Sequence, residues 1–484
     1  MKKIALYIFI CFPLLCKGAN DIISIDDFVN LAFTYSNDYE IYKIQKEINE
    51  RNYKSSMHNF SYTLSLSLQP QYNHAISPIT QPNGSVINHD ITSKSVAPVF
   101  SFSTPIELTG GTFSFGSNFS YNHSQNGDYR NTSYSTNLYH FSYYQPLKLY
   151  NSTKWDKKAI NANYILSEYE SVASYIKLKA KFCSYYFDAL KDQSLIDGLN
   201  QQIESLDTLV IMYTEQYKQG KIIKVELDDI LFSQTDAIEK RKLYQSRLNY
   251  SIKELHNHLK KGYSMNTFNL KRPSNQEYID YNDANIKLKR KQNEYDDIAL
   301  IPWKKRLLES KYNRGIQMTL NTGFGMNSSS ETLSKILEKK SPNISISISA
   351  KVPISDFKEK ENQYKIAKLQ WKQFQISTET QDSEEENELE QLVEHYNYLI
   401  NNINFLKQKE EHINEEIAVK LELLKSGKIL YDEYNYSYQK LLNNINDMIS
   451  AFDSLYSIKC KIELLTLYDF TNNYDYRMLI KNPK

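Results

Sequence analysis

The stretch ISISISAKVPISD, at residues 344–356, shows most directly how this chain is built. Isoleucine and serine alternate from Ile344 to Ser349, and this two-residue period predicts a β-strand with one apolar face and one small-polar face. Pro353 has no backbone N–H for a sheet and marks the end of the strand. Ser355 or Asp356 can then cap a helix. The sequence therefore predicts a strand that leads directly into a helix.

The same order of strand, proline and helix occurs once before in the chain. Pro146 follows an alternating segment and lies 207 residues before Pro353 (353 − 146). Each proline precedes a Gly-Lys-Ile sequence, which begins at Gly220 in the first copy and at Gly427 in the second, and these glycines are also 207 residues apart (427 − 220). An equal offset held over more than seventy residues indicates two internal repeats.

Helical spacing lies on both sides of each glycine. In the first repeat, apolar residues are spaced three and four apart, as in a seam between packed helices: Ile196, Leu199, Ile203, Leu206, Val210 and Tyr213. Few glycines and prolines (13 and 12) interrupt the chain, so we expect long helices. Gly220 and Gly427 would form the tips of two long helical hairpins, because glycine accepts the left-handed backbone of a helix reversal.

Strands precede each hairpin, and the first repeat has more of them. The distance from Tyr62 to Gln317, at the first strands of the two halves, is 255 residues, which leaves 48 extra residues (255 − 207) in the first repeat. These residues contain two alternating segments around Gly110, so we predict one additional hairpin and about six strands per chain. The segments 77–94 and 327–341 are polar, and we predict loops there.

The first eighteen residues are typical of a secretory signal peptide, with Lys2 and Lys3 before an apolar run. Lipidation of Cys16 is the alternative, although Leu15 suits that processing poorly. Removal of residues 1–18 leaves 55 basic and 57 acidic residues, a net charge of −2, with no basic cluster for nucleic acid. Cys183 and Cys460 would remain, each in a helical pattern, and we expect a structural pair rather than a disulfide framework.

These patterns predict a membrane α+β protein with a β-barrel and long helices. The expected segments are a signal peptide (1–18), a helix of repeat 1 (19–60), barrel strands with an extra hairpin (61–147), a helical hairpin (148–262), a linker (263–275), a helix of repeat 2 (276–315), barrel strands (316–354), a second helical hairpin (355–470) and a tail (471–484).

The order of these segments resembles the TolC-like outer membrane efflux protein family over essentially the whole mature chain. The residues that carry the resemblance are 145–147, 152–155, 217–220, 350–356 and 424–427. Prolines expected near Phe60 and Asp38 are absent, which weakens the local alignment. The resemblance implies a homotrimer in the outer membrane that extends into the periplasm. It also implies contact with outer-membrane lipid, a periplasmic adaptor (membrane fusion) protein and an inner-membrane RND or ABC pump.

Six strands in one chain leave two unpaired edges, which hydrocarbon does not tolerate, so several chains must close one barrel. Three chains would supply 18 strands, comparable to a porin with an aqueous lumen. If the extra hairpin instead folds over the periplasmic rim, the barrel has 12 strands. We favour 18.

The hairpin tips are the candidate functional sites. Docking of an adaptor at Gly220 and Gly427, with Lys221 and Lys428 as exposed contacts, is implied by the resemblance. Glu226 and Glu433 occupy equivalent positions in the two repeats. Three chains would bring six such carboxylates to the tunnel mouth, where they would attract cations and respond to pH. The alternative is that both are exposed helix glutamates without a role in the pore.

A second hypothesis concerns matched charges in the two repeats. The offset of 207 residues places lysines 177, 179 and 181 opposite glutamates 384, 386 and 388. Such pairs could fix the order of the repeats around the tunnel, as charge pairs select partners in coiled coils.

No motif of an enzyme, a metal site or a cofactor site is present. The resemblance implies a passive exit duct for a tripartite efflux or type I secretion system, which carries drugs, peptides or proteins. The alternative is a structural or adhesive coiled-coil protein that is anchored by a β-barrel and transports nothing.

Overall fold

The computed structural model describes residues 22–126, 129–147, 150–258, 269–274 and 276–480. The predicted signal peptide and Cys16 lie outside the described residues, as do parts of the linker and of the C-terminal segment. The chain divides into two compact units. Of the described residues, the helical unit contains 22–46, 168–258, 269–274, 276–293 and 381–480, and the sheet unit contains 47–126, 129–147, 150–167 and 294–380.

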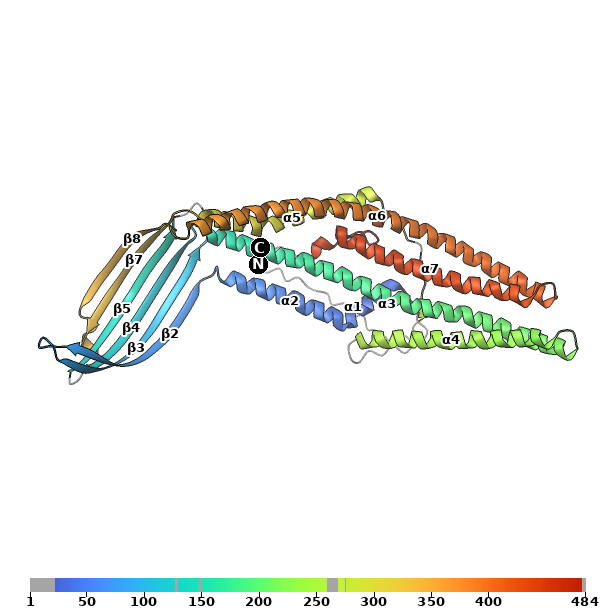
Figure 1. The fold of residues 1–484 in the computed structure, drawn as a ribbon, viewed down its shortest axis with the longest axis horizontal. Coiled ribbons are helices and arrows are strands. Elements are labelled where there is room, and N and C mark those ends of the chain that lie inside the picture. Colours follow the sequence, from blue (N-terminus) through green and yellow to red (C-terminus); the bar gives the residue numbers. More distant parts are fainter. Residues whose placement is uncertain (1–21, 127–128, 148–149, 259–268, 275, 481–484) are drawn as a thin grey trace, which may run out of the picture. The chain divides into compact units, whose positions relative to one another are not determined.

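The sheet unit contains one antiparallel sheet of six strands in the order β2-β3-β4-β5-β7-β8 (Figure 1). The strands are β2 (Thr63–Thr80), β3 (Val86–Ile106), β4 (Gly111–Asn126), β5 (Tyr129–Pro146), β7 (Gln317–Ser330) and β8 (Lys340–Lys351). Strands β3 and β4, which carry the extra segment of the first repeat, pair inside this sheet. Among the described strands, β2 and β8 are the two edges.

Turns in the sheet differ from the prediction at two places, and one of them is the predicted loop 327–341, where residues 327–330 belong to β7 and residues 340–341 belong to β8. The turn between β3 and β4 has Gly110 at φ +73°, as its glycines suggested. The polar segment 77–94 is not a loop, because β2 and β3 pair continuously up to Thr80 opposite Val86. A hydrogen-bonded ladder between two strands holds polar residues as well as apolar ones, so polarity alone was a misleading guide to this hairpin.

Seven helices are present in the described part of the chain. They are α1 (Ile25–Tyr35), α2 (Asn37–His58), α3 (Ser152–Lys218), α4 (Lys224–His258), α5 (Tyr281–Asn313), α6 (Phe357–Lys425) and α7 (Tyr431–Thr466). Helices α3 and α6 have 67 and 69 residues, against about 11–12 for an average helix. None of the described helices is both long enough and apolar enough to cross a membrane.

Two apolar cores hold the helical unit together. One gathers aromatic residues of α3, α6 and α7, including Phe182, Tyr186, Tyr396 and Phe452. The other lies among α3, α4, α6 and α7 and includes the predicted seam residues Leu199, Ile203 and Leu206. Burial of such side chains stabilises each by roughly 1.5–3 kcal/mol, so packing between helices, rather than helix propensity alone, supports elements of this length.

Short segments at the two ends of the helical unit depart from the predicted layout. The expected helix at 19–60 contains two helices, because Ser36 is extended and its Oγ accepts a bond from the Asp38 N–H (3.0 Å) as the cap of α2. Strand β1 (Ile22–Ile23) pairs with β6 (Asn269–Leu270). After α7 the chain forms β9 (Tyr468–Asp469), β10 (Tyr474–Asp475) and η2 (Tyr476–Leu479). The described part of the predicted tail, up to residue 480, therefore contains β10 and η2.

Candidate functional site

The two faces of the sheet differ in chemistry across all six strands. Directly paired residues form one apolar row from edge to edge: Leu64, Phe102, Phe115, Phe141, Phe324 and Ile344. The neighbouring pairs, on the opposite face, form a row of small polar residues: Thr63, Ser103, Ser114, Ser142, Gly323 and Ser345. Successive side chains of a strand point to opposite faces, so one face is apolar and the other is polar.

The apolar face is exposed on this chain. On β8, Ile344, Ile346 and Ile348 are 70%, 74% and 65% exposed. On the opposite edge strand, Leu64, Leu66 and Leu68 are also exposed. A contiguous exposed apolar surface of this kind marks contact with a membrane or another protein. Among the described strands, β2 pairs only with β3 and β8 pairs only with β7, so both edges are free to pair with further strands.

Each hairpin tip closes with the same backbone hydrogen bonds. The Lys221 N–H donates to the Gln216 carbonyl (2.9 Å), and the Gly220 N–H donates to the Tyr217 carbonyl (2.9 Å). The second tip repeats both bonds at Lys428 and Gly427, with 2.9 and 3.0 Å. Gly220 has φ +69° and Gly427 has φ +68°. These are Schellman-type helix ends, in which glycine supplies the left-handed backbone.

The predicted tip residues occupy equivalent places in the two repeats. Lys221 and Lys428 are exposed. Glu226 and Glu433 are exposed and lie in the first turns of α4 and α7. Negative charge in a first turn is favourable because helix N-termini carry partial positive charge. This stabilising role accounts for both carboxylates within one chain, and the pore role predicted for them is still untested.

One pair of tip residues was missed by the sequence analysis. Ile223 and Leu430 precede α4 and α7 and are 63% and 70% exposed. They are also 207 residues apart (430 − 223), so the repeat offset applied beyond the Gly-Lys-Ile sequence would have found them. Each tip therefore presents an aliphatic side chain close to a lysine.

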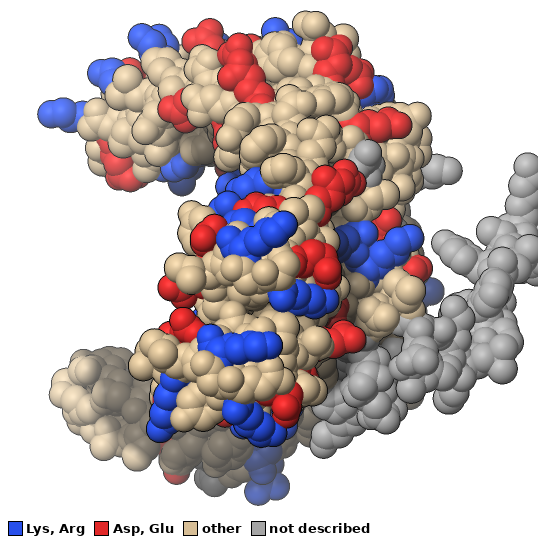
Figure 2. Space-filling model, turned by 90° about the vertical axis from the view of Figure 1, so that its right-hand side faces the viewer, with Lys and Arg blue, Asp and Glu red and all other residues tan. Residues whose placement is uncertain are grey.

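Charges of both signs are mixed around these tips. Figure 2 faces the side of the molecule that carries the tips, and its visible acidic and basic side chains are interspersed, without a broad area of one sign. One exposed ion pair, Lys218 with Glu215 (2.7 Å), lies at the end of α3. A protein that docks on this surface would therefore be held by polar and aliphatic contacts, and not by attraction to a large net charge alone.

Lys179 is the centre of a buried ionic cluster in the helical unit. Its Nζ donates to both oxygens of Glu463 (3.0 and 2.8 Å), to Asp469 (3.1 Å) and to the Tyr476 hydroxyl (3.1 Å). Glu463 is fully buried. The cluster connects α3 with α7 and with the folded C-terminal segment.

This cluster corrects the matched-charge hypothesis. Lys179 pairs within its own chain with Glu463 and Asp469, and Lys181 pairs with Asp38 (2.7 Å). Glu386 lies near Lys289 (3.7 Å). Two of the three lysines thus have acidic partners outside the predicted set. A carboxylate in direct contact within the chain stabilises the charged lysine at least as well as the glutamate at the equivalent position of the other repeat would.

The two carboxylates of the cluster differ in pKa although they share one lysine. Burial raises the pKa of Glu463 above its usual value, against the opposing charge of Lys179. Asp469 is partly desolvated, but Lys179, Lys459 and hydrogen bonds from Asn472 lower its pKa to about 2. The difference follows from environment: Glu463 has no exposed surface, whereas Asp469 accepts two backbone N–H bonds, from Thr471 and Asn472 (3.0 and 3.1 Å).

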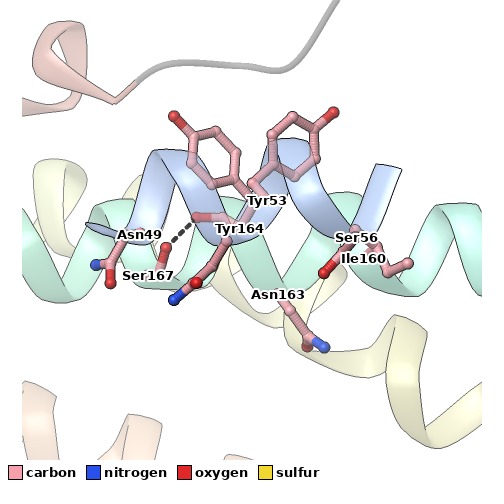
Figure 3. Close-up of a pocket in the computed structure, with 8 residues that line it drawn as sticks. Asn49, Tyr53, Ser56, Ile160, Asn163, Tyr164 and Ser167 are labelled. Atoms are coloured by element: carbon pink, nitrogen blue, oxygen red, sulfur yellow. Dashed lines mark hydrogen bonds between the residues drawn. The ribbon is translucent and has the colours of Figure 1, made fainter. Parts of the chain in front are cut away.

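A pocket of about 230 Å³ lies between α2 and α3 in the sheet unit (Figure 3). The residues that line it are Asn49, Asn52, Tyr53, Ser56, Ile160, Asn163, Tyr164 and Ser167. The rings of Tyr53 and Tyr164 stack on each other with centroids 4.4 Å apart. The lining residues carry no charged group, and the tyrosine faces are partly used in this stack. The pocket therefore has none of the acid–base pairs of a catalytic site.

Solved structures with a similar fold include outer-membrane channels. The outer-membrane channel OprN has a TM-score of 0.64 and 10% identity, with 91% of this chain and 89% of that chain covered. The outer membrane protein VceC of Vibrio cholerae has a TM-score of 0.62 and 10% identity, with 91% and 95% covered. The CmeC channel of Campylobacter jejuni has a TM-score of 0.59 and 13% identity, with 95% and 90% covered.

No protein-family model and no curated protein matches the sequence. The structural likeness nevertheless extends over about nine tenths of the chain. It confirms, at the level of the fold, the resemblance predicted from the repeat and its motifs.

Proposed function

We propose that this chain, which has the fold of outer-membrane channels, is one protomer of an outer-membrane exit duct that extends into the periplasm. In this proposal the duct is passive and serves a tripartite efflux or type I secretion system, with energy from an inner-membrane pump. The observation that carries the proposal is the sheet, whose apolar face is exposed and whose two edges have no partner within the described chain.

The chemistry of the sheet fits a barrel in lipid. An apolar row would face the hydrocarbon, and the small polar row would face a water-filled lumen. Every backbone N–H and C=O in hydrocarbon needs a partner, so β2 and β8 must each pair with another chain. Because the sheet has an even number of strands, β2 and β8 run in opposite directions. Strand β8 can therefore pair antiparallel with β2 of the next protomer.

Three protomers would give a closed barrel of 18 strands. The participation of β3 and β4 in the sheet supports six strands per chain in that barrel, in preference to the arrangement with 12. The small residues on the polar face would leave the lumen open.

The tips are proposed as the docking sites for a periplasmic adaptor. Gly220 and Gly427 form the turns, and Lys221, Lys428, Ile223 and Leu430 would make the contacts, since they are exposed next to those turns. Two equivalent tips per chain would give six in a trimer. Glu226 and Glu433 are proposed to line the tunnel mouth there.

Disulfide cross-linking between protomers tests the closed barrel. We would combine Ser67→Cys on β2 with Ser345→Cys, Ser347→Cys or Ser349→Cys on β8, all of which lie on the polar face. Oxidation of membranes should give covalent trimers for one register and little product for the others. The matched control is Ser142→Cys in place of the β8 substitution, because β5 is paired on both sides within the chain.

The outcome also separates the alternatives. Covalent dimers that never extend to trimers, or equal linking of the control, would contradict a trimeric barrel with β8 next to β2. If trimers form but do not conduct ions in planar bilayers, the chain is a structural or adhesive protein and not a duct.

A further inference from the structure

Helices α3 and α7 pack antiparallel, and their contacts define a register. Lys179 Nζ on α3 lies 2.8 Å from Glu463 on α7. Two turns later on α3, the Phe187 ring lies 5.2 Å from the Tyr456 ring, between centroids. From the first contact to the second, residue numbers rise along α3 and fall along α7. The two contacts are therefore the ends of one continuous strip of the α3–α7 interface.

Cys183 and Cys460 occupy the middle of that strip. Cys183 is four residues after Lys179 and four before Phe187. Cys460 is three residues before Glu463 and four after Tyr456. Residues three and four apart share one face of a helix, so the register places the two cysteines opposite each other.

The surroundings of the two thiols agree with this register. Cys183 and Cys460 are free thiols, and they are only 4% and 3% exposed. The Cys183 side chain forms a hydrogen bond with Cys460, and this contact, followed by burial, raises the pKa of the Cys460 thiol well above its usual value. Two buried thiols that the register places opposite each other across one helix interface can be joined by a disulfide when they meet an oxidant.

We propose that Cys183 and Cys460 form a disulfide that joins α3 to α7 in the exported protein. The inference rests on the proposed function only for its compartment, because the periplasm is oxidising and keeps structural disulfides intact. The bond would connect the long helix of the first repeat to the returning helix of the second.

The chemistry requires an oxidant, and an exported thiol–disulfide oxidoreductase is the appropriate class. One cysteine, as thiolate, attacks the disulfide of the oxidoreductase and forms a mixed disulfide, and the other then displaces the oxidoreductase as its dithiol. The two thiols lose two protons, and two electrons pass to the oxidoreductase. Since both thiols are buried once α3 and α7 have packed, the reaction belongs to the folding stage.

The bond would close a loop of 277 residues (460 − 183) that includes both hairpin tips. A cross-link over so long a loop restricts the unfolded chain strongly. Its burial protects it from reductants in the folded state, so reduction should require opening of the α3–α7 interface.

Peptide mapping tests the proposal directly. The full-length protein is exported, extracted from membranes into denaturant with N-ethylmaleimide, and digested without reduction. Mass spectrometry should find the tryptic peptide 182–191, which contains Cys183, linked to a peptide with Cys460. Maleimide adducts on both cysteines of the exported protein, or a link between two copies of Cys183, would overturn the proposal.

A second measurement separates this proposal from the proposed function. The purified protein is refolded in a mixture of oxidised and reduced glutathione, which tests the bond independently of cellular location. If refolding gives native protein with two free thiols, the disulfide is refuted. Absence of the protein from outer-membrane fractions would instead refute the proposed function.

The bond should also be visible in stability. Dithiothreitol present during heating should lower the unfolding midpoint of the detergent-purified protein by about 5 °C. The matched control is the double variant Cys183→Ala/Cys460→Ala, for which the reductant should have no effect. An equal shift in both proteins would show that no disulfide contributes.

Discussion

Gly220 and Gly427 determine the hairpin tips through backbone conformation and not through packing. At both positions a side-chain carbon would meet nothing within 4 Å, while φ is +69° and +68°. A substitution at either glycine therefore changes only the cost of the left-handed backbone, which is roughly 1–2 kcal/mol for an ordinary L-residue.

Gly220→Ala should loosen the tip without unfolding the chain. We expect amide hydrogen exchange at residues 220 and 221 to accelerate on the order of tenfold, because local opening becomes easier by this backbone cost. Gly220→Asn is the control, since asparagine tolerates left-handed backbone, and it should show a smaller increase. Equal exchange in the two variants and in the unchanged protein would contradict the backbone explanation.

Lys179→Met should destabilise the helical unit by about 3–5 kcal/mol, because it leaves Glu463 and Asp469 as buried charges without their cation. Urea unfolding in detergent measures the loss. Lys218→Met removes an exposed ion pair instead and should change stability by less than about 0.5 kcal/mol. Adding Glu463→Gln to Lys179→Met should recover part of the loss, and a lack of any recovery would disprove the coupling.

The two carboxylates that bind Lys179 should change the stability of the protein in opposite directions as the pH falls. As pH falls through the raised pKa of Glu463, the folded state binds a proton before the unfolded state does, so stability rises. Below about pH 4, protonation of the unfolded chain removes the contribution of Asp469, whose folded pKa is about 2, so stability falls.

Urea midpoints measured between pH 7 and pH 2 would show this rise and fall. Glu463→Gln should abolish the rise and keep the fall, whereas Glu215→Gln, at an exposed position, should leave the profile unchanged. Identical profiles for the unchanged protein and Glu463→Gln above pH 4 would show that Glu463 does not titrate as its burial requires.

At the scale of single residues, the sequence revealed the tips and not the cluster. The left-handed glycines were predictable because the reversal between two helices needs a left-handed residue, and few residue types other than glycine adopt that backbone. Lys179 was matched with Glu386 because the offset of 207 residues places the two at equivalent positions of the repeats. Its buried partners lie 284 and 290 residues away, and no local pattern encodes such a distance.

Among the elements, β8 provides a sharp comparison of the two sheet faces. Ile346→Arg places a charge on the apolar face, which should cost about 2–4 kcal/mol at the centre of a bilayer. Ser345→Arg changes the adjacent residue on the polar face and should leave insertion intact. The fraction of each variant that folds into lipid vesicles measures the difference. Similar insertion of the two variants would show that the apolar face does not meet lipid.

The alternation in β8 made this element easy to predict, whereas other elements were hidden. The hairpin of β2 and β3 extends through polar residues 77–94, where only pairing with the neighbouring strand maintains the structure. The break between α1 and α2 depends on a single serine cap at Ser36, in a segment that otherwise has helical spacing. Side-chain patterns predict faces well, but backbone pairing and caps depend on contacts that a pattern does not contain.

At the scale of the assembled molecule, the tip carboxylates allow a test of the proposed tunnel mouth. Glu226→Gln/Glu433→Gln should reduce the preference of the open channel for cations in planar bilayers, because it removes two negative charges per chain. Glu239→Gln, on an exposed part of α4, is the control and should leave selectivity unchanged. Unaltered selectivity in the double variant would leave the two glutamates with only their role at the helix ends.

Strands β5 and β7 are neighbours in the sheet but are separated by 170 residues of chain, from 147 to 316. Strands β2 to β5 can join by short hairpins, on the microsecond timescale of local pairing. The β5–β7 pair must wait until α3, α4 and α5 have been synthesised and have closed a long loop. Until then β5 has an open edge that can bind a strand of another chain. The order of synthesis therefore exposes this edge to misassembly before β7 is available.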